Sequence, residues 1–288
     1  MRIHVLSVAG RLQPERQGFR YPPHNADYGI EQDFVAYLSS HPELVIDSPA
    51  TADWHYLPVW WTRWHLNHDY GRTGVDELRA AVAAVIVDDA KTFTICQYDD
   101  GPVVDLGATT VFLGSRTRPE GHDVPLLSSP HRRPWWPPRK RYRASFCGRL
   151  STHPLRGRMA GALAGRDDVS IVDGDGGPAF FVRQTLASRI ALAPRGYGGS
   201  SFRFYEAMQL GVVPLLLGDV DTRPFKRLLA WDRVSLYAGS ADAVAALLDA
   251  HDDRQLDAMG RAARALYARH LAYGRWCELV LSELEAIR

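Results

Sequence analysis

The segment that most constrains this chain covers residues 190–219, IALAPRGYGGSSFRFYEAMQLGVVPLLLGD. It begins with a short apolar run that stops at Pro194, passes through a loop containing three glycines, and ends in a second apolar run. Ser200 or Ser201 is a good N-cap for a helix, and Gly211 is a good residue to end it. The pattern therefore predicts a strand, a glycine-rich loop, a helix and a second buried strand.

The loop and the start of the helix carry groups that suit a nucleotide diphosphate. The glycines let backbone N–H groups approach an anion, and a helix N-terminus behind such a loop favours phosphate. Arg203 and Glu206 share one helix face, where an arginine can pair with a diphosphate and a carboxylate can bind a ribose diol. The alternatives are a surface ion pair and an ordinary glycine turn. Neither a Walker loop nor a dinucleotide-binding glycine fingerprint is present.

Further motifs extend this pattern along the chain. The central segment contributes Pro194, Gly196, Ser201, Arg203, Glu206, Ala207, Gly211 and Pro214. Residues 146–149 with Arg156 precede it, and residues 224–225 with Trp231 follow it. Together these positions resemble the signature of the exostosin-like glycosyltransferases, strongly over residues 145–231. Before residue 107 the similarity is weaker and rests on Tyr28, Glu31 and residues 52–58.

The resemblance implies a GT-B fold, and the alternation of expected strands and helices in both halves favours the same α/β class. We expect two Rossmann-like, doubly wound domains facing across a cleft, with a C-terminal helix that crosses back. The expected divisions are an acceptor-side domain at 1–130, a proline-rich linker at 131–143, a donor-binding domain at 144–270 and the returning helix at 271–288. The linker is basic and aromatic, so a nucleic-acid-binding tail is the competing interpretation.

The expected donor site gathers cations, glycines and the helix start of the second half. Its candidate residues are Gly148, Arg149, Arg156, Arg195, Gly196, Ser200, Ser201, Arg203 and Glu206. The resemblance implies an inverting reaction with a nucleotide-diphosphate sugar, UDP foremost, and no metal or other cofactor. The nearest match to a metal-binding acidic pair is Asp173 with Asp175, in a glycine-rich turn.

The first half should supply the acceptor site and the general base. Asp99 and Asp100 follow an expected strand, where a parallel sheet binds ligands, although Asp-Asp-Gly-Pro is also an ordinary turn. His24 and Asp27 are the other candidates for the base. Tyr28, Trp61 and Trp64 are candidates for binding the acceptor, since aromatic faces stack on sugars. The alternative for the two tryptophans is that they fill the core.

Composition argues against a nucleic-acid-binding protein, a cysteine-based metal site and a disulfide framework. The net charge of +1, from 34 basic and 33 acidic residues, gives no general reason to expect nucleic acid as a partner. Three distant cysteines form no metal or disulfide pattern and fit a reducing cytosol. Together with this composition, the resemblance implies a cytoplasmic, bacterial enzyme without membrane insertion that acts on a small-molecule, carrier-bound or glycan-precursor acceptor. The alternatives are a non-catalytic nucleotide- or glycan-binding protein and a phosphorylase or epimerase on the same scaffold.

Overall fold

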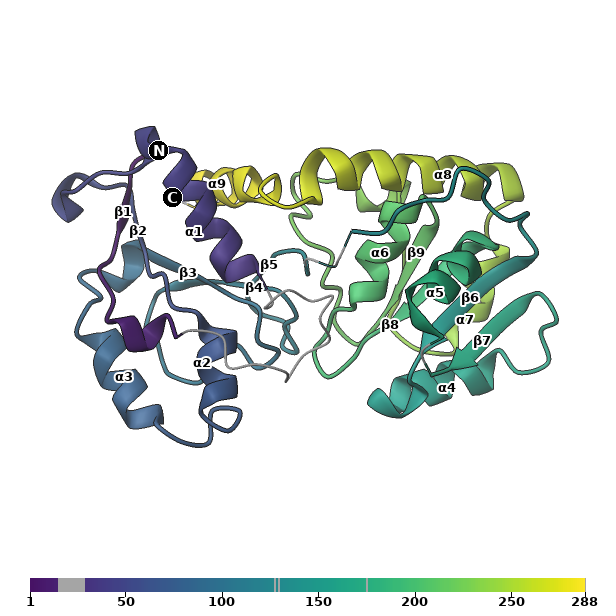
Figure 1. Ribbon diagram of the computed structural model, residues 1–288, viewed down its shortest axis with the longest axis horizontal. Helices are drawn as coiled ribbons and strands as arrows, with labels where there is room; N and C mark the ends of the chain where they lie inside the picture. The colour runs from purple at the N-terminus through teal and green to yellow at the C-terminus, as the bar shows by residue number, and fades with distance from the viewer. Residues whose placement is uncertain (15–28, 127, 129, 175, 288) are drawn as a thin grey trace. The chain divides into compact units, whose positions relative to one another are not determined.

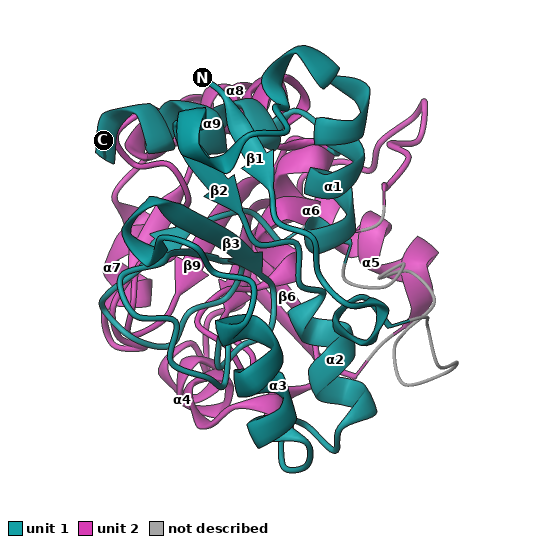
Figure 2. Ribbon diagram, turned by 90° about the vertical axis from the view of Figure 1, so that its left-hand side faces the viewer, with its two compact units in different colours: residues 1–127, 273–288 teal, residues 128–272 magenta. Residues whose placement is uncertain are grey.

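The computed structural model describes residues 1–14, 29–126, 128, 130–174 and 176–287, which form two compact units. Unit 1 comprises residues 1–127 and 273–288, and unit 2 comprises residues 128–272 (Figures 1 and 2). Each unit is built on its own five-stranded parallel sheet covered by helices. The expected fold class, α/β with two doubly wound domains, is confirmed, and the last helix belongs to unit 1.

The sheet of unit 1 reverses its strand order near its first strand. Its strands, in spatial order, are β1 (Ile3–Val5), β2 (Trp54–Tyr56), β3 (Thr92–Cys96), β4 (Thr110–Leu113) and β5 (His122–Asp123). At the free edge of β1, Ile3 also forms a parallel bridge to Val45. The chain therefore passes beyond β1 before it returns to β2, as in doubly wound sheets.

Helices cover both faces of this sheet (Figure 1). They are α1 (Ile30–Ser40), α2 (Trp61–Asn67), α3 (Val75–Ala83) and α9 (Trp276–Ile287). Phe34 of α1 packs against Phe93, whereas Trp61 of α2 donates its indole N–H to Thr94 at 2.8 Å. Because Phe93 and Thr94 are consecutive residues of β3, their side chains point to opposite faces. Thus α1 and α2 lie on opposite sides of the sheet.

The last helix is fixed to α1 by one carboxylate. Asp33 Oδ2 accepts hydrogen bonds from the backbone N–H of Gly274 at 2.9 Å and from Trp276 Nε1 at 2.7 Å. The Trp276 indole is fully buried and lies against Phe34. These contacts, which join positions about 240 residues apart in sequence, hold α9 on unit 1.

The sheet of unit 2 has a reversal of strand order at its centre. Its strands are β6 (Tyr142–Gly148), β7 (Val169–Asp173), β8 (Ser188–Pro194), β9 (Val213–Leu217) and β10 (Leu236–Ala238), arranged as β10-β9-β8-β6-β7 with every neighbouring pair parallel. From β6 the chain moves outward to β7, then crosses back to β8 on the other side. The switch point therefore lies between β6 and β8, where open α/β sheets bind ligands at the carboxyl ends of the strands.

Helices again flank the sheet of unit 2. They are α4 (Pro154–Ala162), α5 (Gly177–Leu186), α6 (Phe202–Leu210), α7 (Ala243–Asp249) and α8 (Asp253–Leu266). Phe146 of β6 packs in a cluster with Met159 of α4, while the adjacent Cys147 packs with Phe181 of α5 and Ala207 of α6. Side chains of β6 thus alternate between two apolar cores, as expected for a central strand buried on both faces.

The segment expected as a linker lies on unit 2. The backbone N–H of His131 donates to Gln209 Oε1 at 2.8 Å, and the same glutamine donates to Ser128 and to Tyr267. The compact units divide at 127/128 and at 272/273, earlier than the expected linker and slightly later than the expected final segment. Hydrogen bonds to α6 therefore anchor the proline-rich run before β6 begins.

Candidate functional site

The carboxyl ends of β6 and β8 place the expected donor residues at the switch point of unit 2. Gly148 ends β6, and Pro194 ends β8. The glycine-rich loop 195–199 follows β8 and leads directly into α6. The sequence thus folds as expected from Ile190 to Leu217, and the site has a strand, a loop and a helix start on one edge.

The start of α6 has an extended N-cap residue. Ser201 has φ −146° and ψ 130°, and its side chain makes no capping hydrogen bond. Ser200 and Ser201 are both buried, and Gly211 ends the helix in the left-handed conformation with φ 73°. The start of α6 thus lies at the carboxyl edge of the sheet, and the dipole of a helix N-terminus favours an anion.

Arg195 holds the glycine-rich loop together. Its Nε donates to the carbonyl of Gly198 at 3.2 Å, and its Nη2 donates to that of Tyr197 at 3.1 Å. Its Nη1 pairs with Asp219, just after β9. Burial raises the pKa of Asp219, but the hydrogen bond and charge of Arg195, together with a backbone hydrogen bond, outweigh burial and lower that pKa below its usual range. Arg195 thus already binds its own loop and a carboxylate.

Arg156 is a cation without a carboxylate partner among the described residues. From α4 it donates to the backbone carbonyls of Arg195 at 2.9 Å, Arg149 at 2.9 Å and Pro194 at 3.4 Å. Its guanidinium lies 5.6 Å from the centroid of the Phe146 ring. Burial, and then the charge of Arg203, lower the pKa of Arg156 to about 10. The charge of this arginine therefore lies at the carboxyl ends of β6 and β8, compensated only by carbonyl dipoles.

The glycines at the switch point allow this close approach. A Cβ on Gly196 would lie 3.4 Å from Arg156 Nη2, and a Cβ on Gly148 would lie 3.0 Å from the Phe146 ring. The second distance is tighter than most real Cβ contacts, so a side chain at Gly148 would displace the ring on which Arg156 rests. Arg149 is exposed beside Gly148 and has only its carbonyl bound to Arg156.

Arg203 and Glu206 form one end of a buried polar cluster. Arg203 Nη1 donates to Glu206 Oε2 at 2.6 Å, and His131 Nε2 lies 3.0 Å from Glu206 Oε1. Phe181 contacts both partners, with the Arg203 guanidinium 4.2 Å from its centroid and the His131 ring at 5.3 Å. Burial raises the pKa of Glu206, but the hydrogen bonds and charges of His131 and Arg203 together outweigh burial and lower the pKa below its usual range, so the carboxylate stays charged. His131 was not expected in this site.

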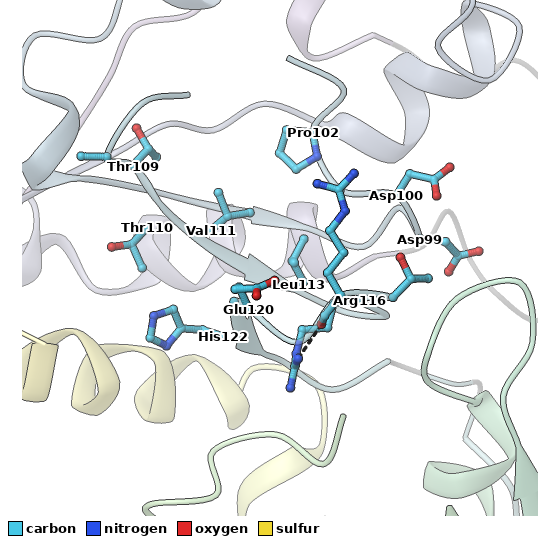
Figure 3. Close-up of a pocket in the computed structure, with 15 residues that line it drawn as sticks. Asp99, Asp100, Pro102, Thr109, Thr110, Val111, Leu113, Arg116, Glu120 and His122 are labelled. Atoms are coloured by element: carbon cyan, nitrogen blue, oxygen red, sulfur yellow. Dashed lines mark hydrogen bonds between the residues drawn. The ribbon is translucent and has the colours of Figure 1, made fainter. Parts of the chain in front are cut away.

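In unit 1, Asp99 and Asp100 line a cavity of about 490 Å³ (Figure 3). They lie at one end of it, and Thr110 and His122 lie at the other. The backbone N–H of Gly101 donates to the carbonyl of Tyr98 at 2.9 Å, so the acidic pair sits in a tight turn, as the alternative interpretation expected. Both the turn and the cavity are present, and they are compatible.

The remaining first-half candidates have different outcomes. His24, Asp27 and Tyr28 lie outside the described residues. Trp61 and Trp64 are buried in the core of unit 1 with exposed fractions of 0 % and 3 %, so they present no ring face to an acceptor. The expectation of an aromatic platform at these two positions is corrected, because residues 61–67 form α2 and direct both indoles inward.

Glu31 is a buried carboxylate that the sequence offered only as part of the weak N-terminal resemblance. It accepts hydrogen bonds from the backbone N–H of Thr62 at 3.1 Å, the Thr62 hydroxyl at 2.9 Å and the backbone N–H of Gln97 at 3.0 Å. Burial raises its pKa to about 7 even though these donors lower it. Glu31 therefore joins α1, α2 and the end of β3 beneath the carboxyl edge of the sheet.

Among the residues with described positions, no three His, Cys, Asp or Glu side chains are grouped to hold a metal ion. Asp173 accepts a hydrogen bond from the backbone N–H of Leu150 at 2.8 Å, and Asp175 lies outside the described residues. No helix in the described part of the chain has the length and apolarity needed to cross a membrane.

No family model and no curated protein matches the chain. Solved structures similar to it include HepE from Anabaena in complex with UDP-glucose, at 10 % identity and a TM-score of 0.41, covering 98 % of this chain and 100 % of HepE. TarM, known from Staphylococcus aureus, gives 9 % identity and a TM-score of 0.38 over 73 % of this chain, which spans 57 % of TarM. The glycosyltransferase SnogD from Streptomyces nogalater gives 14 % identity and a TM-score of 0.30, over 66 % of this chain and 56 % of SnogD.

Proposed function

We propose that this protein is a glycosyltransferase that uses a nucleotide-diphosphate sugar, with UDP as the foremost nucleotide. The observation that carries the proposal is the position of Arg156. Its half-buried guanidinium donates to three carbonyls at the switch point and has no carboxylate partner among the described residues. A desolvated cation without a counter-ion is suited to an anion that arrives from solution, and a diphosphate supplies that charge.

The donor diphosphate would lie between Arg156, Arg203 and the start of α6. As the bond from the sugar to the diphosphate breaks, negative charge grows on the leaving oxygen, and these fixed cations and the helix dipole stabilise it. This arrangement requires no metal ion. Arg149, exposed on the same edge, is a further partner for the outer phosphate, while Arg195 shapes the loop that carries the glycines.

Glu206 is the candidate for binding the ribose, but a ribose hydroxyl would have to share or replace a partner that the carboxylate already has. Its side chain is 2 % exposed, and its two oxygens already bind His131 and Arg203. Because a carboxylate oxygen has two lone pairs, a ribose hydroxyl can share an oxygen with His131 or displace the imidazole. His131 is therefore part of the proposed donor site.

The transfer itself would proceed with inversion. An acceptor hydroxyl or amine attacks the anomeric carbon on the face opposite the departing diphosphate, and a base takes the acceptor proton. Asp99 and Asp100, which line the cavity of unit 1, are the described candidates for this base, and His24 and Asp27 remain sequence-based candidates. A hexosyl or N-acetylhexosaminyl group and a small-molecule, carrier-bound or glycan-precursor acceptor complete the proposal.

A thermal-shift screen against UDP, GDP, dTDP, ADP and CMP, with and without EDTA, tests the donor assignment. A ligand at about 100 times its dissociation constant stabilises the folded state by roughly 2.7 kcal/mol, which raises the melting temperature by a few degrees. We expect a selective shift with one nucleoside diphosphate that EDTA leaves unchanged. Absence of a shift with every nucleotide would refute the donor site. Binding without turnover of any donor sugar would favour a non-catalytic nucleotide-binding protein.

A further inference from the structure

Residues 130–141 form a basic, aromatic segment of unit 2 whose exposed side chains the proposed reaction does not use. The segment contains no helix or strand and runs past α6 and α8 toward β6 (Figure 1). Trp135 and Trp136 are 88 % and 85 % exposed, more than any other large hydrophobic residue in the described structure. Pro134 and Pro137 flank them and favour an extended backbone that keeps both indoles outside the core.

The part of the sequence that contains these indoles is rich in positive charge. Residues 124–166 contain ten Lys and Arg and no Asp or Glu, in a protein whose net charge is only +1. The exposed cations within the segment are Arg132, Arg133, Arg139 and Arg141. Lys140 has another role, since its Nζ donates to the carbonyl of Ser188 at 2.6 Å, and burial lowers its pKa to about 8. Lys140 anchors the segment to β8 while the arginines face solvent.

The inner side of the segment borders an apolar hollow. A cavity of about 690 Å³ lies between the segment and α5, with prolines, Trp136 and Val182 forming much of its lining and with Arg132 and Arg183 also bordering it. Apolar surface beside solvent-exposed indoles and exposed arginines matches a partner that has an apolar layer beneath an anionic surface. Such a partner is a bilayer that contains anionic lipids.

We propose that residues 130–141 are a docking surface for an anionic lipid bilayer. Indole rings favour the headgroup region, where an apolar body and a polar N–H are both accommodated, and each arginine near an anionic leaflet strengthens binding by about fivefold. Single-stranded nucleic acid also pairs cations with aromatic rings, but it needs a groove that tracks its backbone. Both indoles here are almost fully exposed, and the hollow that Trp136 borders is lined mostly by apolar side chains rather than by a row of cations. The contact is peripheral and uses the exposed indoles and arginines of the segment, whereas His131 of the same segment binds Glu206 in the proposed donor site.

Vesicle co-sedimentation of the full chain tests this surface. The probes are vesicles of phosphatidylcholine alone, the same vesicles with phosphatidylglycerol, and a single-stranded oligonucleotide. We expect binding to the phosphatidylglycerol vesicles that weakens with salt and is accompanied by a blue shift of tryptophan fluorescence. Arg132→Gln with Arg139→Gln should weaken binding by about 25-fold, the product of two fivefold effects. Trp135→Ser with Trp136→Ser should abolish the blue shift.

Matched controls separate this surface from general charge and from misfolding. Arg233→Gln with Arg254→Gln removes the same charge from exposed positions elsewhere on unit 2, and Tyr70→Ser removes an exposed aromatic side chain of unit 1. These controls should bind vesicles as the wild type does, and circular dichroism should show every variant folded. The proposal is overturned if the wild type ignores phosphatidylglycerol, if both arginine pairs weaken binding equally, or if the oligonucleotide binds more tightly than the vesicles.

Discussion

Arg203 and Glu206, one turn apart on α6, form an ion pair of 2.6 Å in which the carboxylate is 2 % exposed and the guanidinium 28 % exposed. The bond uses one guanidinium nitrogen, and the plane of the group lies over the ring of Phe181. Glu206 therefore fixes the direction of a cation that still reaches solvent. This geometry gives the carboxylate a positioning role in addition to the proposed contact with ribose.

Glu206→Ala should destabilise unit 2 by about 3–5 kcal/mol, because it removes one partner of a buried ion pair and leaves Arg203 and His131 unsatisfied. Glu206→Gln keeps the shape and should cost less, while weakening UDP binding through a less fixed Arg203. Urea unfolding measures the first effect, and calorimetric titration with UDP measures the second. If Glu206→Gln bound UDP as the wild type does, neither the ribose contact nor the positioning role would stand.

Arg195→Gln should loosen the loop 195–199, because its bonds to Gly198, Tyr197 and Asp219 hold that loop closed. The loss of charge-assisted bonds should lower the free energy of unfolding by about 1–3 kcal/mol. Limited proteolysis should then cut at the loop, which the wild type protects. Arg227→Gln, an exposed position of the same unit, is the control. Unchanged protection in Arg195→Gln would contradict this role.

The pH dependence of the free energy of unfolding should reveal the raised pKa of Glu31. Its pKa is about 7 in the folded protein, raised by burial from an ordinary value of 4.5, so the folded state binds more protons between these two values. The free energy of unfolding therefore falls as pH rises from 4.5 to 7. The size of this contribution is about 3 kcal/mol, at 1.36 kcal/mol for each pKa unit. Burial lowers the pKa of His65 from 6.5 to about 4, which contributes an opposite slope over part of this range. The Glu31 contribution is therefore measured as the difference in slope between the wild type and Glu31→Gln in urea titrations at several pH values. An unchanged slope in Glu31→Gln would contradict the raised pKa.

Loss of the proposed base should reduce turnover and leave donor binding unchanged. Asp99→Asn or Asp100→Asn should lower UDP release from the donor sugar in the presence of acceptor by about 10²–10⁴-fold, the usual range for a lost general base. Affinity for UDP should stay unchanged, since the cavity belongs to unit 1. Asp47→Asn removes an exposed carboxylate of the same unit as a control. Full turnover in both cavity variants would leave His24 and Asp27 as the remaining candidates.

The sequence predicted the second half of the fold closely. The helix expected between the N-cap serines and Gly211 is α6, because an N-cap serine, a left-handed Gly211 and runs of apolar residues act locally. The first half was less predictable. Trp61 and Trp64 suggested an aromatic surface for the acceptor but lie in the buried helix α2. Neither helix propensity nor composition reveals which face of a tryptophan-rich helix will be covered by the sheet.

Contacts between residues far apart in the sequence also could not be predicted from it. Nothing in its local pattern indicates that His131, in a proline-rich run, reaches Glu206 at 3.0 Å, across 75 positions. Nor does it reveal that Arg195 binds its own loop while Arg156 has no carboxylate partner among the described residues. Each of these arginines is followed by a glycine in the sequence. Their roles differ because Arg156 lies on α4 and donates to carbonyls at the end of β8.

The most direct test of the central claim is calorimetric titration of UDP into Arg156→Gln. A charge-assisted hydrogen bond contributes about 1.5–3 kcal/mol, so binding should weaken by about tenfold to a hundredfold. The matched control is Arg158→Gln, two residues along the same helix and exposed. The account predicts that Arg156→Gln loses affinity while Arg158→Gln and the fold are unaffected. Wild-type affinity in Arg156→Gln would contradict the assignment of this edge of unit 2 as a diphosphate site.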